Sequence, residues 1–491
     1  MSRVLPSSNR TNLEPQNLVL ESTENQVNAD LKGTHRAMVT HQSESAGAPR
    51  LRRALGLWDL ILYGLIVIQP TAPMPVYGVM STRSHGYAVV TVLLAMVAML
   101  FTAISYGRMA SAYPSAGSAF TYVGREIHPA LGYLTGWSMA MDYMLNPLIC
   151  TILCSKFSMN FFPEIPYPVW VVTFVTLITL LNLQGIKTTA RINSSLVVVM
   201  CVVIVFFLAA AVRYVHAMPH DGFAFFTRPF FDPKTFSIRP ILGGTSLAVL
   251  TYIGFDGIST LSEEARNPRR DILLATVSVC LLTGLLASIE VYAAQLIWPG
   301  AQNFPDVDTA FVFVAGKAGG RWLFSLINIT LLVATVGSAL GAQLGAARLF
   351  YAMGRSSALP RGFFATIDPK RRIPRNNVLL VGAVALIGAL AMSFERGVEL
   401  LNFGALLAFM GVNCSAFVRY YLRETRRHWF NLASPVSGFL ICALLWLSLS
   451  WRAKELGIAW IIIGLTWGAY NTRGFRRELV NLEIPDQESE I

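Results

Sequence analysis

Apolar segments of about 20 residues recur from Leu55 almost to the end of the chain. A helix of that length crosses the hydrocarbon core of a bilayer and satisfies its own backbone hydrogen bonds there. Hydrophobic residues make up 54% of the chain and charged residues only 14%, which excludes an ordinary soluble domain. The sequence therefore predicts an all-α membrane protein.

Twelve transmembrane helices are expected. They are placed at about 55–80, 87–110, 129–155, 168–184, 190–215, 240–263, 272–298, 322–351, 377–394, 399–420, 434–450 and 455–470. Together they form one membrane domain, 51–471. Residues 1–50 are polar and rich in Ser, Asn, Gln and Thr, which predicts a disordered cytoplasmic tail. A short C-terminal tail is expected at 472–491.

The net charge of +11 reflects topology rather than a nucleic-acid partner. Most Lys and Arg residues after Arg50 fall in loops on the side of the bilayer that holds the amino terminus. They include Arg348, Arg355, Arg361, Lys370, Arg371, Arg372 and Arg375. Because positively charged loops mark the cytoplasmic face, the protein is expected in the cytoplasmic (inner) membrane with both termini on the cytoplasmic side.

The first span is predicted to be broken at Gln69–Pro75. Three prolines within six residues cannot continue a helix, because proline lacks an N–H and its ring crowds the preceding turn. Irregular backbone survives at membrane depth only where protein buries it or a cavity adjoins it. Gln69 and Thr71 are therefore candidate binding residues.

A second break is predicted in the sixth span, at Gly254–Gly257. Two glycines three apart permit it, and Asp256 lies between them. An ionisable residue at membrane depth is a functional candidate, and a broken helix with an acid is typical of a transporter binding site. Tyr252, Gly254, Phe255, Asp256 and Gly257 are the predicted substrate-binding residues here. The alternative role for Asp256 is a helix cap.

The two breaks are five helices apart. An odd number of spans per unit makes the second unit run opposite to the first across the membrane. The spacing therefore predicts a 5+5 inverted repeat, about 55–215 and 240–420, with a midplane site where the broken helices meet. Helices 11 and 12, about 434–470, lie outside the repeat.

Two further acids lie inside predicted spans: Asp142 and Glu290. Each is a candidate for proton coupling or for a second charge at the site. The alternatives are interhelical packing for Asp142 and a position near the outer rim for Glu290. The six cysteines and seven histidines show no ligand spacing, so no metal or cofactor is predicted. A nucleophile elbow and a nucleotide loop are also missing, which argues against an enzyme.

Several motifs together resemble those of the amino acid–polyamine–organocation permeases, and among them bacterial putrescine importers. These motifs lie at 113–122, 136–143, 182–187, 252–268, 346–355 and 402–405. The resemblance implies the twelve-helix inverted-repeat fold shared with sodium-coupled amine transporters. It also implies alternating access, coupled to protons or to exchange of a counter-substrate.

Two positions depart from the family pattern. Amino-acid members have a Gly-Ser-Gly-like break in span 1 whose N–H groups hold the substrate carboxylate, whereas this chain has prolines there. Some proton-coupled members have a lysine in span 5, where this chain has Met200. The expected function is import of a small amine, with putrescine or a polyamine favoured. The alternative is an amino-acid permease or exchanger, in which the half-helix starting near Gly257 binds the carboxylate.

Overall fold

The computed structural model describes residues 54–113, 118–184, 190–300, 303–355, 359–424 and 428–472, without the side chains of 190–194. All of them belong to one compact unit, Arg53–Ile491. The predicted tails, 1–50 and 472–491, lie outside the described residues except for Thr472. Four residues of the 113–122 motif, 114–117, also lie outside them.

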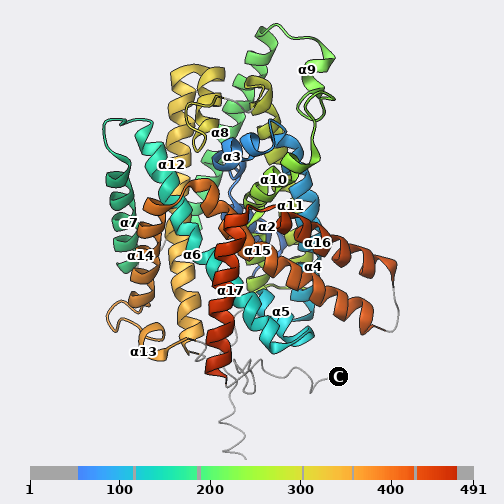
Figure 1. The fold of residues 1–491 in the computed structure, drawn as a ribbon, viewed down its shortest axis with the longest axis vertical. Helices are drawn as coiled ribbons and strands as arrows, with labels where there is room; N and C mark the ends of the chain where they lie inside the picture. Colours follow the sequence, from blue (N-terminus) through green and yellow to red (C-terminus); the bar gives the residue numbers. More distant parts are fainter. Residues whose placement is uncertain are drawn as a thin grey trace, which may run out of the picture. The chain divides into compact units, whose positions relative to one another are not determined.

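The described part of the chain is helical, and its β-structure amounts to one isolated bridge between Leu55 and Ala265. Figure 1 shows the helices packed side by side in a bundle. In chain order they are α2 (Leu57–Ile68), α3 (Pro73–Arg83), α4 (Ala88–Ala112), α5 (Ser118–Glu126), α6 (Pro129–Met159), α7 (Tyr167–Leu183), α8 (Ala190–Ala217), α9 (Phe223–Thr227), α10 (Ile238–Ala248), η1 (Val249–Tyr252), η2 (Phe255–Leu261), α11 (Pro268–Ile297), α12 (Ala310–Arg355), α13 (Arg361–Phe364), α14 (Arg375–Ala391), α15 (Phe394–Phe417), η3 (Val418–Leu422), α16 (Trp429–Ser448) and α17 (Trp451–Asn471).

Seven helical segments among these residues are long and apolar enough to cross a membrane, and the bent pair α2–α3 makes an eighth. The seven are α4, the part of α8 from Ser195, α10 with η1 and η2, α11, α12, α15 with η3, and α16. Two shorter helices, α7 and α14, are also apolar. The protein is therefore a multi-pass membrane protein.

The first span is interrupted at residues 69–72, the first part of the predicted break Gln69–Pro75, while Pro73 and Pro75 lie inside α3. The helix α2 ends at Ile68. The next residue, Gln69, has a φ of 67°, which lies outside the right-handed helical region and is an uncommon backbone angle for a residue with a Cβ. The next helix, α3, begins at Pro73, which suits the first helical position because no N–H is needed there. The axes of α2 and α3 differ in direction by 55°.

The sixth span is interrupted at Gly254, the first residue of the predicted break, while Gly257 lies inside η2. After α10 the chain tightens into η1, becomes extended at Ile253 and turns at Gly254, whose φ is 122°. A Cβ at Gly254 would lie 2.9 Å from Cγ1 of Val67 and 3.3 Å from Cγ1 of Ile68. Glycine is therefore required twice here, for its backbone angle and for the close approach of the two breaks.

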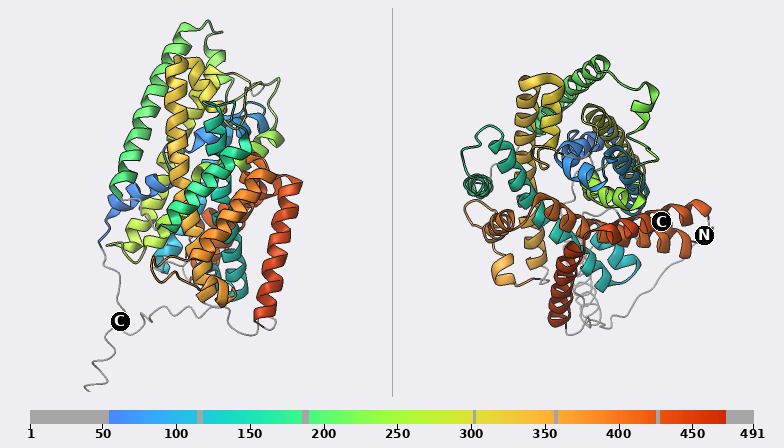
Figure 2. Two further views of the ribbon diagram at one scale, coloured as in Figure 1. Left: turned by 90° about the vertical axis from the view of Figure 1, so that its left-hand side faces the viewer. Right: turned by 45° about the horizontal axis from the view of Figure 1, so that its top comes forward.

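Small residues allow the surrounding helices to pack closely, as expected where lipid supplies no hydrophobic drive between helices. A Cβ on Gly107 of α4 would come within 2.6 Å of Cα of Leu273 in α11. A Cβ on Gly404 of α15 would come within 2.5 Å of the Ser138 carbonyl in α6. Such contacts hold α4, α6, α11 and α15 around the two breaks. Two further views of the bundle are given in Figure 2.

Candidate functional site

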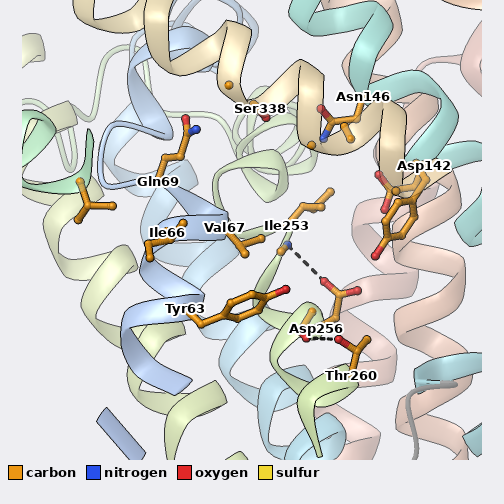
Figure 3. A pocket seen from close by; sticks show the side chains of 18 of the residues that line it. Tyr63, Ile66, Val67, Gln69, Asp142, Asn146, Ile253, Asp256, Thr260 and Ser338 are labelled. Carbon is orange, nitrogen blue, oxygen red and sulfur yellow. Dashed lines mark hydrogen bonds between the residues drawn. The ribbon is translucent and has the colours of Figure 1, made fainter. Parts of the chain in front are cut away.

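A cavity of about 390 Å³ lies beside the two breaks (Figure 3). Five parts of the chain enclose it: α2, the turn from Ile253 into η2, α6, α8 and α12. Its lining comprises Tyr63, Ile66, Val67, Gln69, Asp142, Tyr143, Asn146, Leu196, Val197, Met200, Ile253, Gly254, Asp256, Gly257, Thr260, Gly337, Ser338, Gly341, Ala342 and Gly345. This is a concave site of the size that small ligands occupy.

Two carboxylates line the cavity, Asp142 from α6 and Asp256 from η2. Both are mostly buried, with 8% and 7% of their surface exposed. Lysine, arginine and histidine are all missing from the described lining. An unpaired buried charge is costly. Each of these two acids therefore needs a cationic partner or must bind a proton itself.

The break itself positions Asp256. The backbone N–H of Gly254 donates to Oδ1 of Asp256 at 3.3 Å, which the turn at Gly254 makes possible. Asp256 also lies in the first turn of η2, where backbone N–H groups favour a negative charge. Neutral polar groups adjoin it: Thr260 donates its hydroxyl to the Gly257 carbonyl, and the Tyr63 hydroxyl lies beside Asp256 in Figure 3.

Two amide side chains complete the polar lining. Gln69 follows directly after α2, and its Nε2 donates to the Ala334 carbonyl of α12 at 3.2 Å, which fixes the orientation of the amide. Asn146 lies one helical turn after Asp142 on α6, so both face the same side of that helix. The cavity therefore offers carboxylate, amide and hydroxyl oxygens from three directions.

Glycines of α12 leave space on one wall of the cavity. Gly337, Gly341 and Gly345 are spaced by four residues and share one helix face. A Cβ built at Gly337 or Gly341 meets no atom within 4 Å. The missing side chains therefore contribute directly to the cavity volume.

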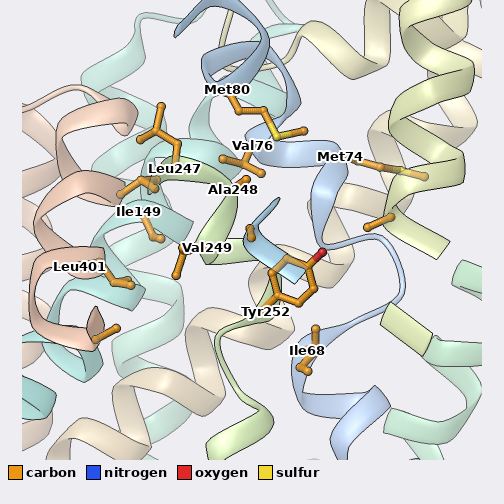
Figure 4. Close-up of a cluster of buried hydrophobic side chains, with 14 of the residues drawn as sticks. Ile68, Met74, Val76, Met80, Ile149, Leu247, Ala248, Val249, Tyr252 and Leu401 are labelled. Carbon is orange, nitrogen blue, oxygen red and sulfur yellow. The ribbon is translucent and has the colours of Figure 1, made fainter. Parts of the chain in front are cut away.

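The other side of the breaks is closed by packed apolar side chains. In Figure 4 this apolar cluster joins Met74, Val76 and Met80 of α3, Leu247 and Ala248 of α10, Val249 of η1, Ile149 of α6 and Leu401 of α15. The described cavity lining contains residues of neither α3 nor α10. The cavity thus lies on the α2–η2 side of the breaks, and the apolar cluster packs against the breaks on the α3–α10 side.

Three of the backbone N–H groups at the first break are occupied within the chain. The N–H of Gln69 donates to the Leu65 carbonyl at 3.1 Å, that of Ala72 to Gln69 at 3.1 Å, and that of Met74 to Thr71 at 3.0 Å. The three prolines have no N–H to donate. This break therefore lacks the row of free donors that would cradle a carboxylate.

Five of the nine predicted site residues line this cavity: Gln69, Asp142, Gly254, Asp256 and Gly257. Gly257 faces open space, since a Cβ there would meet only the Tyr63 hydroxyl, at 4.0 Å. Met200, which the resemblance aligned with a lysine of some relatives, also lies in the lining and adds an apolar surface.

The other four predicted residues lie outside the lining. Thr71 is 2% exposed inside the first break. Tyr252 turns its hydroxyl away to the Val92 carbonyl of α4, at 2.8 Å. Phe255 packs its ring against Tyr106 and Phe409, because an apolar ring gains more from core contacts than from a polar cavity. Glu290 is fully buried in α11, and neither of its carboxyl oxygens has a hydrogen-bond partner among the described residues.

Sequence reasoning missed several lining residues, chiefly Tyr63, Asn146, Ser338 and the α12 glycines. Two signals were available: the one-turn spacing of Asp142 and Asn146, and the four-residue spacing of three glycines. Groups of three or more His, Cys, Asp or Glu side chains that could hold a metal ion do not occur among the described residues.

Membrane helices broken beside a polar cavity define the class of the protein as a membrane transporter. Sequence comparison identifies the family. The profile of the amino acid permease family matches residues 73–470, and the chain belongs to that family. It is a transporter and not an enzyme.

Three similar proteins are named for different substrates. The low-affinity putrescine importer PlaP of Escherichia coli (strain K12) is 35% identical over 444 residues, which cover 88% of this chain and 96% of the relative. The branched-chain amino acid permease BcaP of Bacillus subtilis (strain 168) is 26% identical over 449 residues, 86% of this chain and 93% of the relative. The vacuolar cationic amino acid transporter 4 of Arabidopsis thaliana is 25% identical over 409 residues, 77% of this chain and 65% of the relative.

Proposed function

We propose that this protein is a secondary active transporter that imports a small amine, with putrescine or a related polyamine as the favoured substrate, across the cytoplasmic membrane. The observation that carries the proposal is the pair Asp142 and Asp256 in one cavity whose described lining has no basic side chain. A diamine carries two ammonium groups, and each needs an anionic or carbonyl partner when it leaves water.

In this proposal Asp256 binds one ammonium group and Asp142 the other. Tyr63 and Tyr143 adjoin the carboxylates and supply aromatic faces to a cation. Ile66, Val67 and Leu196 give an apolar wall for the methylene chain between the two charges. Glu290 does not line the cavity, so Asp142 takes the role of second charge.

The fold is proposed to have twelve spans in a 5+5 inverted repeat. There are eight apolar spans when α2–α3 is counted as one, and adding the helices α6, α7, α14 and α17 gives twelve. In that order the broken spans are the first and the sixth, five apart. The close contact of Gly254 with Val67 and Ile68 supports a site built where the two breaks meet.

Alternating access is proposed to operate around the breaks. The cavity lies on the α2–η2 side, while the apolar cluster of Figure 4 fills the α3–α10 side. Opening the opposite side requires α3 and α10 to separate from α6 and α15 while α2 and η2 close. Basic loops at the α2 end place that end in the cytoplasm under the positive-inside rule, so this conformation faces inward.

Glu290 is the proposed proton carrier. It is a fully buried acid of α11, and its two oxygens have no hydrogen-bond partner among the described residues. In such a setting the charged carboxylate costs far more free energy than the protonated acid. Because that cost falls when a conformational change brings water or a polar partner to the carboxyl, protonation is coupled to the conformation. The absence of a lysine at Met200 leaves the coupling to the acids.

The second candidate function is an amino-acid permease, as in the BcaP relative. It would place the substrate carboxylate at the N-terminus of η2 near Gly257. Asp256 is already there, and three N–H groups of the first break, those of Gln69, Ala72 and Met74, are occupied. A second carboxylate in that position would be repelled, so the geometry favours the amine.

Uptake into proteoliposomes with an imposed pH gradient tests the proposal. Labelled putrescine should accumulate above its equilibrium level when the outside is acidic, and Glu290→Gln should abolish this while leaving exchange of internal for external putrescine. The matched control is Glu164→Gln in the exposed loop before α7. Accumulation by Glu290→Gln equal to that of the control would contradict the role of Glu290, and absence of any putrescine uptake would contradict the function.

A further inference from the structure

A second polar cleft lies at one edge of the bundle, where α7 ends and α14 begins. The basic cleft, as we call it, has a volume of about 300 Å³ and is lined by Leu183, Asp368, Lys370, Arg371, Ile373 and Arg375. Figure 1 shows α7, α13 and α14 together at one edge of the bundle. The cleft shares no residue with the transport cavity.

The loop that forms the basic cleft is well organised. Asp368 accepts the backbone N–H groups of Lys370 and Arg371, each at 2.9 Å. The backbone N–H of Asp368 donates to the Ile373 carbonyl at 2.9 Å, and the Arg371 guanidinium donates to the Leu183 carbonyl at 2.7 Å. These bonds tie the loop to the end of α7 and hold three cations around one opening.

Charge in the cleft is unbalanced. The only acid in its described lining is Asp368, whose pKa is lowered by the N–H bonds from Arg371 and Lys370 and by the nearby Arg371 and Arg375 charges. Its carboxylate is thus engaged in holding the loop. Lys370 and Arg375 are exposed and make no ion pair within 4.0 Å with any described residue. Two cations are therefore free to bind an anion.

The helices on either side of the cleft present bare apolar side chains. Leu180 lies one turn before the cleft on α7 and is 50% exposed, and Leu379 lies one turn after it on α14 and is 42% exposed. Further along, Leu177 and Ile387 are exposed as well. Phe363 of α13 and Ile367 of the loop that follows it are 43% and 44% exposed. The basic cleft therefore opens at the end of an exposed apolar surface formed by α7 and α14.

We propose that the basic cleft binds the headgroup phosphate of an anionic phospholipid. Lys370 and Arg375 bind the phosphate oxygens, with Arg371 beside them, and the acyl chains lie along the exposed apolar faces of α7 and α14. Basic pockets between spans at a membrane–water interface are suited to such headgroups, because the phosphate meets charge and the tails meet apolar surface together. A free phosphate would contact only the basic side chains and leave the apolar surface unused.

Lipid retention by the full-length protein tests the proposal. Native mass spectrometry, with phosphatidylglycerol and phosphatidylcholine titrated into the detergent-purified protein, measures binding without transport. Lys370→Gln/Arg375→Gln removes two charges and spares Arg371, whose bond holds the loop. Lys234→Gln/Arg239→Gln is the matched control, because both residues are exposed in the segment before and at the start of α10.

The expected result is preferential retention of phosphatidylglycerol by the native protein and the control, with at least a tenfold weaker affinity in Lys370→Gln/Arg375→Gln. Inorganic phosphate at millimolar concentration should not displace the lipid. Equal retention by the variant and the control, equal binding of phosphatidylcholine, or full displacement by inorganic phosphate would each overturn the lipid assignment. A folded variant is verified by an unchanged thermal unfolding midpoint without added lipid.

Discussion

Asp142 of α6 and Asp256 of η2 line the same cavity from different helices (Figure 3). The described lining provides no lysine, arginine or histidine to neutralise them. Two such carboxylates favour a positively charged substrate. The role of each can be determined by replacing one carboxylate at a time and comparing substrates that carry one or two positive charges.

Asp256→Asn should weaken putrescine binding tenfold or more, about 1.4 kcal/mol, because it removes the carboxylate that the break positions. Binding is measured by isothermal titration calorimetry on the purified protein. The matched control is Asp221→Asn, whose side chain is 71% exposed and remote from the cavity lining. Near-native affinity in a folded Asp256→Asn protein would contradict the assignment.

Asp142→Asn should distinguish a diamine from a monoamine. With Asp256 intact, one ammonium group keeps its partner, so binding of a monoamine of equal chain length should change little. Putrescine should lose most of the advantage it has over that monoamine. Competition against labelled putrescine in proteoliposomes gives both affinities. An equal loss for both amines would mean that Asp142 supports the fold rather than the second charge.

Gly341 offers a test of the cavity by volume. Gly341→Leu places a side chain where a Cβ meets no atom within 4 Å, so the helix should form and the cavity should be filled. Gly341→Ala adds one carbon and should retain most uptake. Uptake should therefore fall in the order Gly, Ala, Leu, while the thermal unfolding midpoint stays level or rises, since alanine and leucine favour helix over glycine. Full uptake by Gly341→Leu would show that the substrate does not use this space.

Cysteine accessibility distinguishes the two faces of the first break. In a background with Cys201, the exposed native thiol, replaced by serine, Ser338→Cys should react with a polar thiol reagent and putrescine should slow the reaction. Thr71→Cys should react far more slowly, because Thr71 is buried and lies outside the lining. Rapid, substrate-protected labelling at Thr71 would mean that the first break exposes its other face during transport.

The sequence was sufficient to predict both breaks, because proline and glycine act locally. Pro70 cannot extend α2, and Pro73 and Pro75 fit only the first turn of the new helix α3; at position 254 only glycine tolerates the backbone angle and the close neighbours. The placement of Asp256 beside a break followed from those positions. These conclusions depend on short-range geometry, which a single sequence carries.

Which side chains face the cavity could be predicted only in part, because helix rotation is set by distant partners. Tyr252 and Phe255 flank the second break, yet one bonds to Val92 of α4 and the other packs against Phe409 of α15. In a membrane protein both the lipid face and the core are apolar, so hydrophobic periodicity does not tell them apart. The α12 glycines were missed for the same reason, since their open space exists only in the packed bundle.

The central claim is that the cavity carries a diamine. The most direct measurement is uptake of labelled putrescine into proteoliposomes in competition with spermidine, a monoamine of equal chain length, and single amino acids. We expect strong inhibition by the polyamine, weak inhibition by the monoamine and none by neutral amino acids, with uptake lost in Asp142→Asn/Asp256→Asn. Uptake of a neutral amino acid that putrescine does not inhibit, and that survives in the double variant, would contradict the account.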